Sequence, residues 1–374
     1  MKNNITLHPE GGDGAGQVSA ADVEAIDELR ELNGKMREEM ARIIIGQEQV
    51  IEQMLMCILS RGHGLLMGVP GLAKTLMVNS LSRIMSLDFS RIQFTPDLMP
   101  SDITGTDILQ ETDQPGRRAF EFVKGPVFAN IILADEINRT PPKTQSAMLE
   151  AMQEHRVTVA GKQMTLEEPF FVLATQNPIE QEGTYPLPEA QQDRFMFLIN
   201  VDYPSVDEER GIARETTGSA APELSKVIDG PTIIKYQELV ERVPVPDHVY
   251  DDVVDLVRLS RPNDDAPEWI RKWVTWGAGP RAVQYLIRGA KAHTVLHGRY
   301  MASWEDVEAV AKPVLSHRIL TNFQAQSEGV DSSFIIEQLV KVIADEETRN
   351  DLASQGETEE SAGKSFNVKT GKFE

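Results

Sequence analysis

The stretch from Gly64 to Thr75 constrains the fold of this chain more than any other. A short apolar run, Gly64 to Met67, leads into a glycine-rich loop, and Lys74 and Thr75 then open a helical pattern. A buried strand, a loop of converging backbone N–H groups and a helix N-terminus together form a cradle for a polyphosphate. The chain is therefore expected to contain a nucleotide-binding α/β core.

This phosphate loop departs at one position from the pattern G-x-x-x-x-G-K-[ST], because Ala73 stands where the second glycine is expected. Alanine is expected to take a right-handed conformation there at little cost, so that the loop closes slightly differently. Lys74 is predicted to reach the β- and γ-phosphates, and the Thr75 hydroxyl to bind Mg²⁺. The alternative is a surface turn that happens to contain Gly, Pro and Lys.

Two carboxylates follow an uninterrupted apolar run. Asp135 and Glu136 end a segment, Asn130 to Ala134, that is typical of a buried parallel strand with a site at its carboxyl end. Asp135 is predicted to complete the Mg²⁺ site of Thr75, and Glu136 to orient or deprotonate the attacking water. A strand followed by an acidic helix start is the alternative.

Four further residues are candidates for the same site. Asn177, at the tip of an apolar strand, is expected to hydrogen-bond the γ-phosphate or the attacking water, and can also cap the following turn. Arg194, before the last predicted core strand, is either a surface ion-pair partner or a cation directed at a phosphate. Arg281 lies in a predicted first helical turn, where a cation needs a nearby anion. Gly46 offers a flat slot for adenine or forms a helix-capping turn.

Composition excludes several classes of protein. Of 374 residues, 41% are hydrophobic and 25% charged, which fits two globular domains. The single cysteine, Cys57, excludes disulfide frameworks and cysteine-rich zinc sites and is expected to be a buried thiol. No apolar run is long enough to span a membrane and the N-terminus is polar, so a cytoplasmic location is expected. A net charge of −21 disfavours nucleic-acid binding.

The pattern predicts an α/β fold with a parallel sheet flanked by helices, followed by a small all-helical domain. Hairpins are expected at 106–125 and 156–165, before and after the segment that contains the carboxylates. The expected divisions are a flexible N-terminal tail (1–20), the α/β core (21–204), a linker (205–232), the helical domain (233–344) and a flexible C-terminal tail (345–374).

With these motifs in this order, the chain from Ile43 to Arg318 resembles the AAA+ ATPases of the MoxR family. The resemblance rests on four segments: Gly68–Thr75, Ala134–Arg139, Ala174–Pro178 and Leu187–Phe195. The family has alanine at the position of Ala73. The helical domain then corresponds to the family's lid, 106–125 to its helix-two insert and 156–165 to its pre-sensor hairpin.

The resemblance implies a role for each candidate. The Walker A pair is Lys74 and Thr75, the Walker B pair Asp135 and Glu136, and sensor one Asn177. Arg194 matches an arginine finger that reaches a neighbouring subunit's nucleotide, and Arg281 matches sensor two. The predicted catalytic residues are Glu136, Lys74, Asn177, Arg194 and Arg281, and the predicted metal ligands are Thr75 and Asp135. The predicted ATP-binding residues are Gly46, Gly68, Val69, Pro70, Gly71, Leu72, Ala73, Lys74, Thr75 and Leu76.

Such proteins are ring-forming, usually hexameric, chaperone-like ATPases that use ATP and Mg²⁺ to remodel or activate a protein client, commonly with a partner that bears a von Willebrand factor A domain. The main alternative is a nucleic-acid-linked AAA+ motor of the helicase or loader type, which the acidic charge disfavours. A GTPase or small-molecule kinase is a further alternative. No guanine-reading segment occurs, and a carboxylate beside the metal-binding Asp135 suits activation of water better. A non-hydrolysing scaffold is disfavoured because every catalytic role has a candidate residue.

Overall fold

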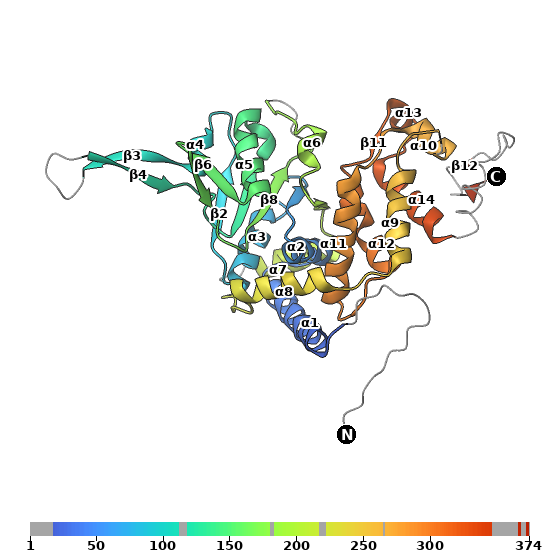
Figure 1. The fold of residues 1–374 in the computed structure, drawn as a ribbon, viewed down its shortest axis with the longest axis horizontal. Coiled ribbons are helices and arrows are strands. Elements are labelled where there is room, and N and C mark those ends of the chain that lie inside the picture. Colours follow the sequence, from blue (N-terminus) through green and yellow to red (C-terminus); the bar gives the residue numbers. More distant parts are fainter. Residues whose placement is uncertain are drawn as a thin grey trace, which may run out of the picture.

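The computed structural model describes residues 18–111, 118–179, 183–216, 222–264, 266–345, 366–367 and 372–373. Figure 1 shows an α/β part that carries the N-terminal strands and a mainly helical part beside it. This arrangement confirms the predicted fold class of a parallel sheet flanked by helices and followed by a small helical domain.

A five-stranded parallel sheet forms the centre of the α/β part, in the order β2-β5-β8-β1-β9. Its strands are β1 (Gly64–Met67), β2 (Phe89–Gln93), β5 (Ile131–Asp135), β8 (Phe171–Gln176) and β9 (Phe197–Asn200). Strands β1, β5 and β8 are almost entirely buried, which explains their uninterrupted apolar sequences. Because all the strands are parallel, their carboxyl ends form one edge of the sheet and their amino ends the opposite edge.

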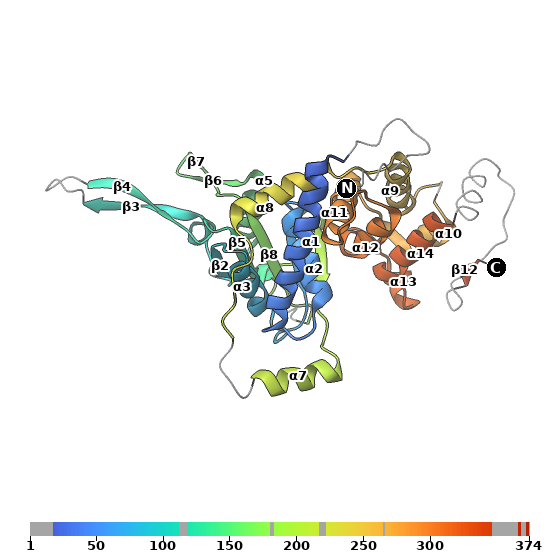
Figure 2. The same cartoon turned by 90° about the horizontal axis from the view of Figure 1, so that it is seen from below.

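Helices cover the sheet and connect it to the second part. They are α1 (Ala20–Ala41), α2 (Glu48–Leu59), α3 (Lys74–Ile84), α4 (Pro100–Thr104), the short η1 (Ile137–Arg139), α5 (Pro142–Glu154) and α6 (Glu189–Gln192). The apolar stripe of α1 is buried, with Leu29 and Met40 fully inaccessible. Figure 2 shows α1 alongside α2 and α11, and α1 contacts α3, α8 and α11, so this helix joins the two parts.

Both predicted hairpins are present. Strands β3 (Gly105–Glu111) and β4 (Arg118–Lys124) pair antiparallel and extend away from the sheet (Figure 1), and the predicted turn between them lies outside the described residues. Strands β6 (Arg156–Val159) and β7 (Lys162–Thr165) form the second hairpin.

The helical part is formed by α8 (Gly230–Arg242), α9 (Asp247–Leu259), α10 (Glu268–Trp273), α11 (Pro280–Leu296), α12 (Trp304–Leu315), α13 (Phe323–Ser327) and α14 (Ser332–Ala344). The prediction of an all-helical domain is wrong in one detail, because β10 (Val274–Trp276) and β11 (Leu320–Thr321) form a short antiparallel pair within it. None of the helices in the described ranges is long and apolar enough to cross a membrane.

The predicted linker contains regular structure, which corrects the sequence interpretation. Helix α7 (Val206–Thr216) lies inside 205–232, and α8 begins before the predicted end of the linker. Ser205 and Glu208 form a capping box, in which each side chain accepts a hydrogen bond from the other's backbone N–H. In the predicted C-terminal tail, β12 (Phe366–Asn367) pairs with β13 (Lys372–Phe373), and the rest of that tail from 346 lies outside the described residues.

Candidate functional site

The phosphate loop connects β1 to α3, which begins at Lys74. Gly71 and Ala73 both have left-handed backbone conformations, with φ of 89° and 55°. The right-handed conformation expected for Ala73 is therefore wrong, and the alanine keeps the geometry that a glycine would supply, at a cost of about 1 kcal/mol. Gly68 is needed for a different reason: a Cβ there would lie 2.6 Å from the carbonyl oxygen of Val201.

The Lys74 ammonium lies within this loop and donates hydrogen bonds to the carbonyl oxygens of Gly68 and Val69, at 2.6 and 3.0 Å. Burial lowers the pKa of Lys74, and the negative charges of Asp135 and Glu136 act in the opposite direction. The cation is therefore in electrostatic reach of both carboxylates. Thr75 is half-buried and Leu76 exposed, both in the first turn of α3.

Asp135 ends β5 at the same edge of the sheet. Its Oδ2 accepts hydrogen bonds from Arg91, at 3.1 Å from Nε and 2.6 Å from Nη2. Its Oδ1 accepts a hydrogen bond from the Thr175 hydroxyl at 2.6 Å. The carboxylate is thus oriented by two neighbouring strands, and its oxygens are the kind of ligand that Mg²⁺ prefers.

Glu136 follows with a left-handed backbone, φ 56°, which is uncommon for a residue with a side chain. Its N–H donates to the Thr175 hydroxyl at 2.8 Å. Its Oε2 accepts a hydrogen bond from Gln93 at 2.8 Å and lies 3.3 Å from Arg139. Because of this backbone turn, the Glu136 side chain has partners different from those of Asp135.

Asn177 comes directly after β8, beside the phosphate loop, because the Gly68 N–H donates to the Gln176 carbonyl. Its Oδ1 accepts a hydrogen bond from the Ile179 N–H at 3.2 Å, so the turn-capping role exists. The side chain is buried, and within the described part of the chain its Nδ2 has no hydrogen-bond partner. This buried donor, together with the Lys74 cation and the Asp135 carboxylate, fits a bound Mg²⁺–nucleotide.

Gly46 lies in a left-handed turn, φ 72°, directly before α2. A Cβ at this position would lie 2.1 Å from Oε1 of Glu208 in α7. The conformation of Gly46 is therefore that of the turn that was one of the two alternatives. The Glu208 carboxylate lies against this glycine, where the flat slot for adenine was expected.

Arg194 and Arg281 lie away from this edge of the sheet. The Met196 N–H donates to the carbonyl of His63, which precedes β1, so the segment before β9 lies at the amino edge. Arg281 pairs with Asp193 in that segment at 2.9 Å. Tyr285 of α11 donates to the Arg194 carbonyl, so both arginines are found where the helical part meets the sheet. The anion that was expected beside Arg281 is, within this chain, the Asp193 carboxylate.

The sequence interpretation missed four polar residues that organise these groups. Arg91 and Gln93 are two apart on β2 and therefore face the same side, a period-2 signal that was available. Thr175 looked like an ordinary strand residue. Arg318 had no sequence signal: it is almost fully buried and donates to the Asp193 carboxylate at 2.7 Å and to four carbonyls of this junction.

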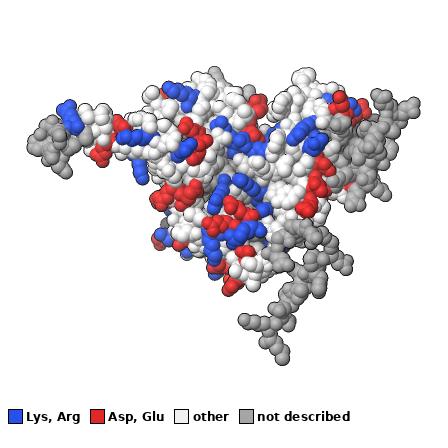
Figure 3. Space-filling model, in the orientation of Figure 1, with Lys and Arg blue, Asp and Glu red and all other residues white. Residues whose placement is uncertain are grey.

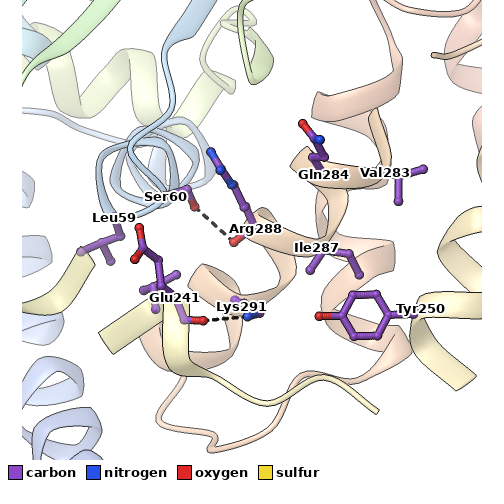
Figure 4. Close-up of a pocket in the computed structure, with 10 residues that line it drawn as sticks. Leu59, Ser60, Glu241, Tyr250, Val283, Gln284, Ile287, Arg288 and Lys291 are labelled. Carbon is purple, nitrogen blue, oxygen red and sulfur yellow. Dashed lines mark hydrogen bonds between the residues drawn. The ribbon is translucent and has the colours of Figure 1, made fainter. Parts of the chain in front are cut away.

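A separate cavity of about 360 Å³ lies between the end of α2 and helices α8, α9 and α11 (Figure 4). Leu59, Tyr250 and Ile287 give it an apolar lining. At its rim, Ser60 donates to the Arg288 carbonyl and Lys291 to the Glu241 carbonyl. None of the predicted site residues lines it.

Two family descriptions match the chain. Residues 63–197 match the "ATPase family associated with various cellular activities (AAA)", and residues 269–339 match the "AAA lid domain". The first match contains the phosphate loop, both carboxylates, Asn177 and Arg194, and the second contains Arg281.

Known proteins give the same result over most of the chain. The chain is 44% identical to Chaperone MoxR1 of Mycobacterium tuberculosis over 82% of its length and 80% of that protein. It is 29% identical to Protein MoxR of Paracoccus denitrificans, over 74% of this chain and 85% of the relative. A crystal structure of a predicted ATPase from Cytophaga hutchinsonii matches with a TM-score of 0.79 and 40% identity, and the match covers 86% of this chain and 97% of that one.

Proposed function

Because this chain belongs to the MoxR family of AAA+ ATPases, we propose that it hydrolyses ATP with Mg²⁺ in an oligomeric ring and uses the energy to remodel or activate protein clients. The observation that carries this proposal is the Lys74 ammonium, enclosed by its own loop and in electrostatic reach of Asp135 and Glu136. A triphosphate is the ligand whose charge and shape match this combination.

Each residue of the carboxyl edge has a separate task in the proposed reaction. The loop amides and Lys74 bind the phosphates, and Thr75 and Asp135 hold Mg²⁺, which neutralises charge on the phosphates when bound. Glu136 orients and deprotonates the attacking water. The Nδ2 of Asn177 donates to the γ-phosphate or to that water, which accounts for a buried donor that has no partner among the described residues. Phosphoryl transfer depends mainly on such positioning and charge stabilisation.

The position of Arg194 and Arg281 supports the ring. They lie at the amino edge of the sheet, whereas the phosphate loop lies at the carboxyl edge. One chain therefore carries the two halves of the proposed site on different faces, and a second copy is needed to bring an arginine to the phosphates. A closed ring satisfies this requirement for every subunit, and we propose a hexamer.

The client role rests on the family. One relative carries the printed name "Chaperone MoxR1", and we propose a protein client, with a partner that bears a von Willebrand factor A domain. Figure 3 shows basic and acidic side chains interspersed over one face of the chain. With a net charge of −21, neither this surface nor the comparisons favour a nucleic-acid motor. The buried thiol of Cys57 fits a reducing compartment, and we propose the cytoplasm.

The test is the substitution Glu136→Gln in the full-length protein. It is expected to keep ATP binding and to lower phosphate release by on the order of 10²-fold or more, because the general base is lost while the phosphate contacts remain. Lys74→Ala is the companion variant and should lose nucleotide binding. ATP binding is measured with a fluorescent analogue, and hydrolysis by phosphate release with ATP and GTP compared.

Wild-type protein that leaves ATP intact at every protein concentration, or Glu136→Gln that hydrolyses ATP at the wild-type rate, would contradict the proposal. The same Glu136→Gln protein should retain its client in a crosslinking pull-down with ATP. Stimulation of hydrolysis by DNA or RNA that weakens steeply with salt would instead support the nucleic-acid alternative.

A further inference from the structure

Helices α2 and α11 bring together three potential metal ligands, none of which belongs to the proposed nucleotide site. Glu52 of α2, His293 of α11 and His297, which caps the end of α11, each offer one ligand atom, and these atoms all lie within 4.8 Å of one another. The two histidines are one helical turn apart, and their rings lie 4.2 Å apart between centroids. Figure 2 shows α2 beside α11, and the two helices are in contact.

Hydrogen bonds orient both imidazole rings. The Nδ1 of His293 lies 2.7 Å from Oδ1 of Asp306, and Arg299 also pairs with that fully buried carboxylate. The Nδ1 of His297 lies 2.9 Å from the carbonyl oxygen of His293. The carbonyl beside His297 only accepts, so in the neutral ring its Nδ1 carries the hydrogen and its Nε2 presents a lone pair. The Asp306 carboxylate favours the same tautomer of His293, and Arg299 Nη2, a donor, lies farther from that Nδ1 at 3.3 Å. A carboxylate or carbonyl that holds Nδ1 in this way is the usual support of a metal-binding histidine.

Glu52 completes the group. Its side chain is largely buried, and its Oε1 points towards the basic side chains of Arg37 and His297. This oxygen lies 3.4 Å from Nε2 of His297, so two acceptors face each other across a gap that a cation would fill. Arg37 of α1 forms an ion pair with the same oxygen at 2.8 Å and is the group with which a metal would compete.

We propose that Glu52, His293 and His297 form a binding site for Zn²⁺ or a similar divalent transition metal. Two imidazole nitrogens and one carboxylate oxygen are a common protein ligand set for Zn²⁺, and a solvent molecule takes the fourth position. The His297 side chain is 42% exposed, which leaves the site open to solvent on that side. Mg²⁺ and Ca²⁺ prefer sites built from oxygen atoms alone.

Metal binding here would connect the two parts of the chain. Helix α2 leads directly into β1 and the phosphate loop, whereas α11 begins at Pro280 and carries Arg281 in its first turn. A bound metal would replace the Arg37 ion pair by ligand bonds from both helices and resist their separation. The site does not depend on ATP hydrolysis, so it can be tested even if the proposed ATPase function fails.

The test is a Co²⁺ titration of tag-free, full-length protein without nucleotide, followed by visible absorption. Wild type should bind one Co²⁺ per chain with nitrogen and oxygen ligands, and Zn²⁺ should displace it. His297→Ala and Glu52→Gln should each weaken binding by on the order of 100-fold, since each removes a ligand. Arg37→Gln should strengthen binding, because it removes the competing cation.

Two control variants accompany this test. His248→Ala changes an exposed histidine of the neighbouring helix α9, and Asp135→Asn removes a proposed Mg²⁺ ligand, so both should bind Co²⁺ as wild type does. Zn²⁺ should also raise the melting temperature of wild type and leave that of Glu52→Gln unchanged. Absence of Co²⁺ binding in wild type, or equal binding in His297→Ala and His248→Ala, would overturn the proposal. The contact between Glu52 and His297 would then be an ordinary ion pair between a carboxylate and an imidazolium.

Discussion

The two edges of the central sheet use polar groups in opposite ways. At the carboxyl edge, Glu136 has a left-handed backbone, Lys74 donates to its own loop and the Nδ2 of Asn177 has no partner in the described structure. At the amino edge, His63 accepts a hydrogen bond from the Val172 N–H at Nδ1, and its Nε2 donates to the Met152 carbonyl. Asn177 of the proposed nucleotide site thus keeps a free donor within the described residues, whereas both ring nitrogens of His63 are engaged in holding the fold.

The junction before β9 shows both kinds of group. The Arg194 guanidinium has no hydrogen-bond or ion-pair partner among the described residues, although its carbonyl accepts from Tyr285. Arg318, which lies beside it in space, is enclosed by Asp193 and four carbonyls.

Arg194→Ala is expected to have the largest effect. It should lower turnover by on the order of 10³- to 10⁵-fold and leave ATP binding unchanged, because in the proposed ring the guanidinium acts on a neighbour's phosphates. Phosphate release from mixtures with Lys74→Ala should recover partly, since such a ring contains sites with an intact loop and an intact arginine. Arg214→Ala, an exposed arginine of α7, is the control. No recovery at any mixing ratio would place Arg194 in its own subunit's site.

Arg318→Ala is expected to lower the free energy of unfolding by about 3 kcal/mol, because it leaves several buried carbonyls and the Asp193 carboxylate without their donor. Arg281→Ala removes a partner of the same carboxylate, but that side chain is 37% exposed. Its loss should cost less than about 1 kcal/mol. Urea denaturation of both variants measures the difference, and equal costs would mean that burial does not distinguish these two arginines.

His63 gives the amino edge a pH dependence. Burial lowers the pKa of His63 from 6.5 to about 4. Between these two pH values His63 is mostly protonated in the unfolded protein and mostly neutral in the folded protein. The free energy of unfolding is therefore not reduced by His63 above pH 6.5. It decreases as the pH drops from 6.5 towards 4, by about 3 kcal/mol at most.

His63→Gln is the comparison for this measurement, because a glutamine can accept and donate on the same two sides without titrating. Urea unfolding at several pH values should show a steeper loss between pH 6.5 and 4 in wild type than in the variant. Parallel pH profiles would contradict the assignment of this loss to His63.

Gln93→Ala is expected to have the smallest effect. It removes the hydrogen bond that holds Oε2 of Glu136 at 2.8 Å, and one such bond contributes about 0.5 to 1.5 kcal/mol. Basal phosphate release should rise by about 2- to 10-fold as the carboxylate becomes available to water. Gln163→Ala, on the exposed β7, should change nothing. A fall in the rate of Gln93→Ala would mean that Gln93 positions Glu136 for reaction.

The elements that depend on local pattern could be predicted from the sequence. Uninterrupted apolar runs predicted β1, β5 and β8, and glycine, lysine and threonine in fixed order predicted the phosphate loop, because backbone shape and burial are local properties. The linker prediction overlooked α7, although the capping box of Ser205 and Glu208 was visible.

The contacts between polar groups could not be predicted from the sequence, because they depend on the packing of distant elements. The pairing of Arg91 with Asp135 joins residues 44 positions apart, and that of Asp193 with Arg318 joins residues 125 apart. The Glu52, His293 and His297 cluster likewise required α2 to pack on α11. The spacing of residues in the sequence shows which side chains are neighbours on one strand or helix. Contacts between distant residues depend instead on strand order and helix packing, which result from the folding of the whole chain.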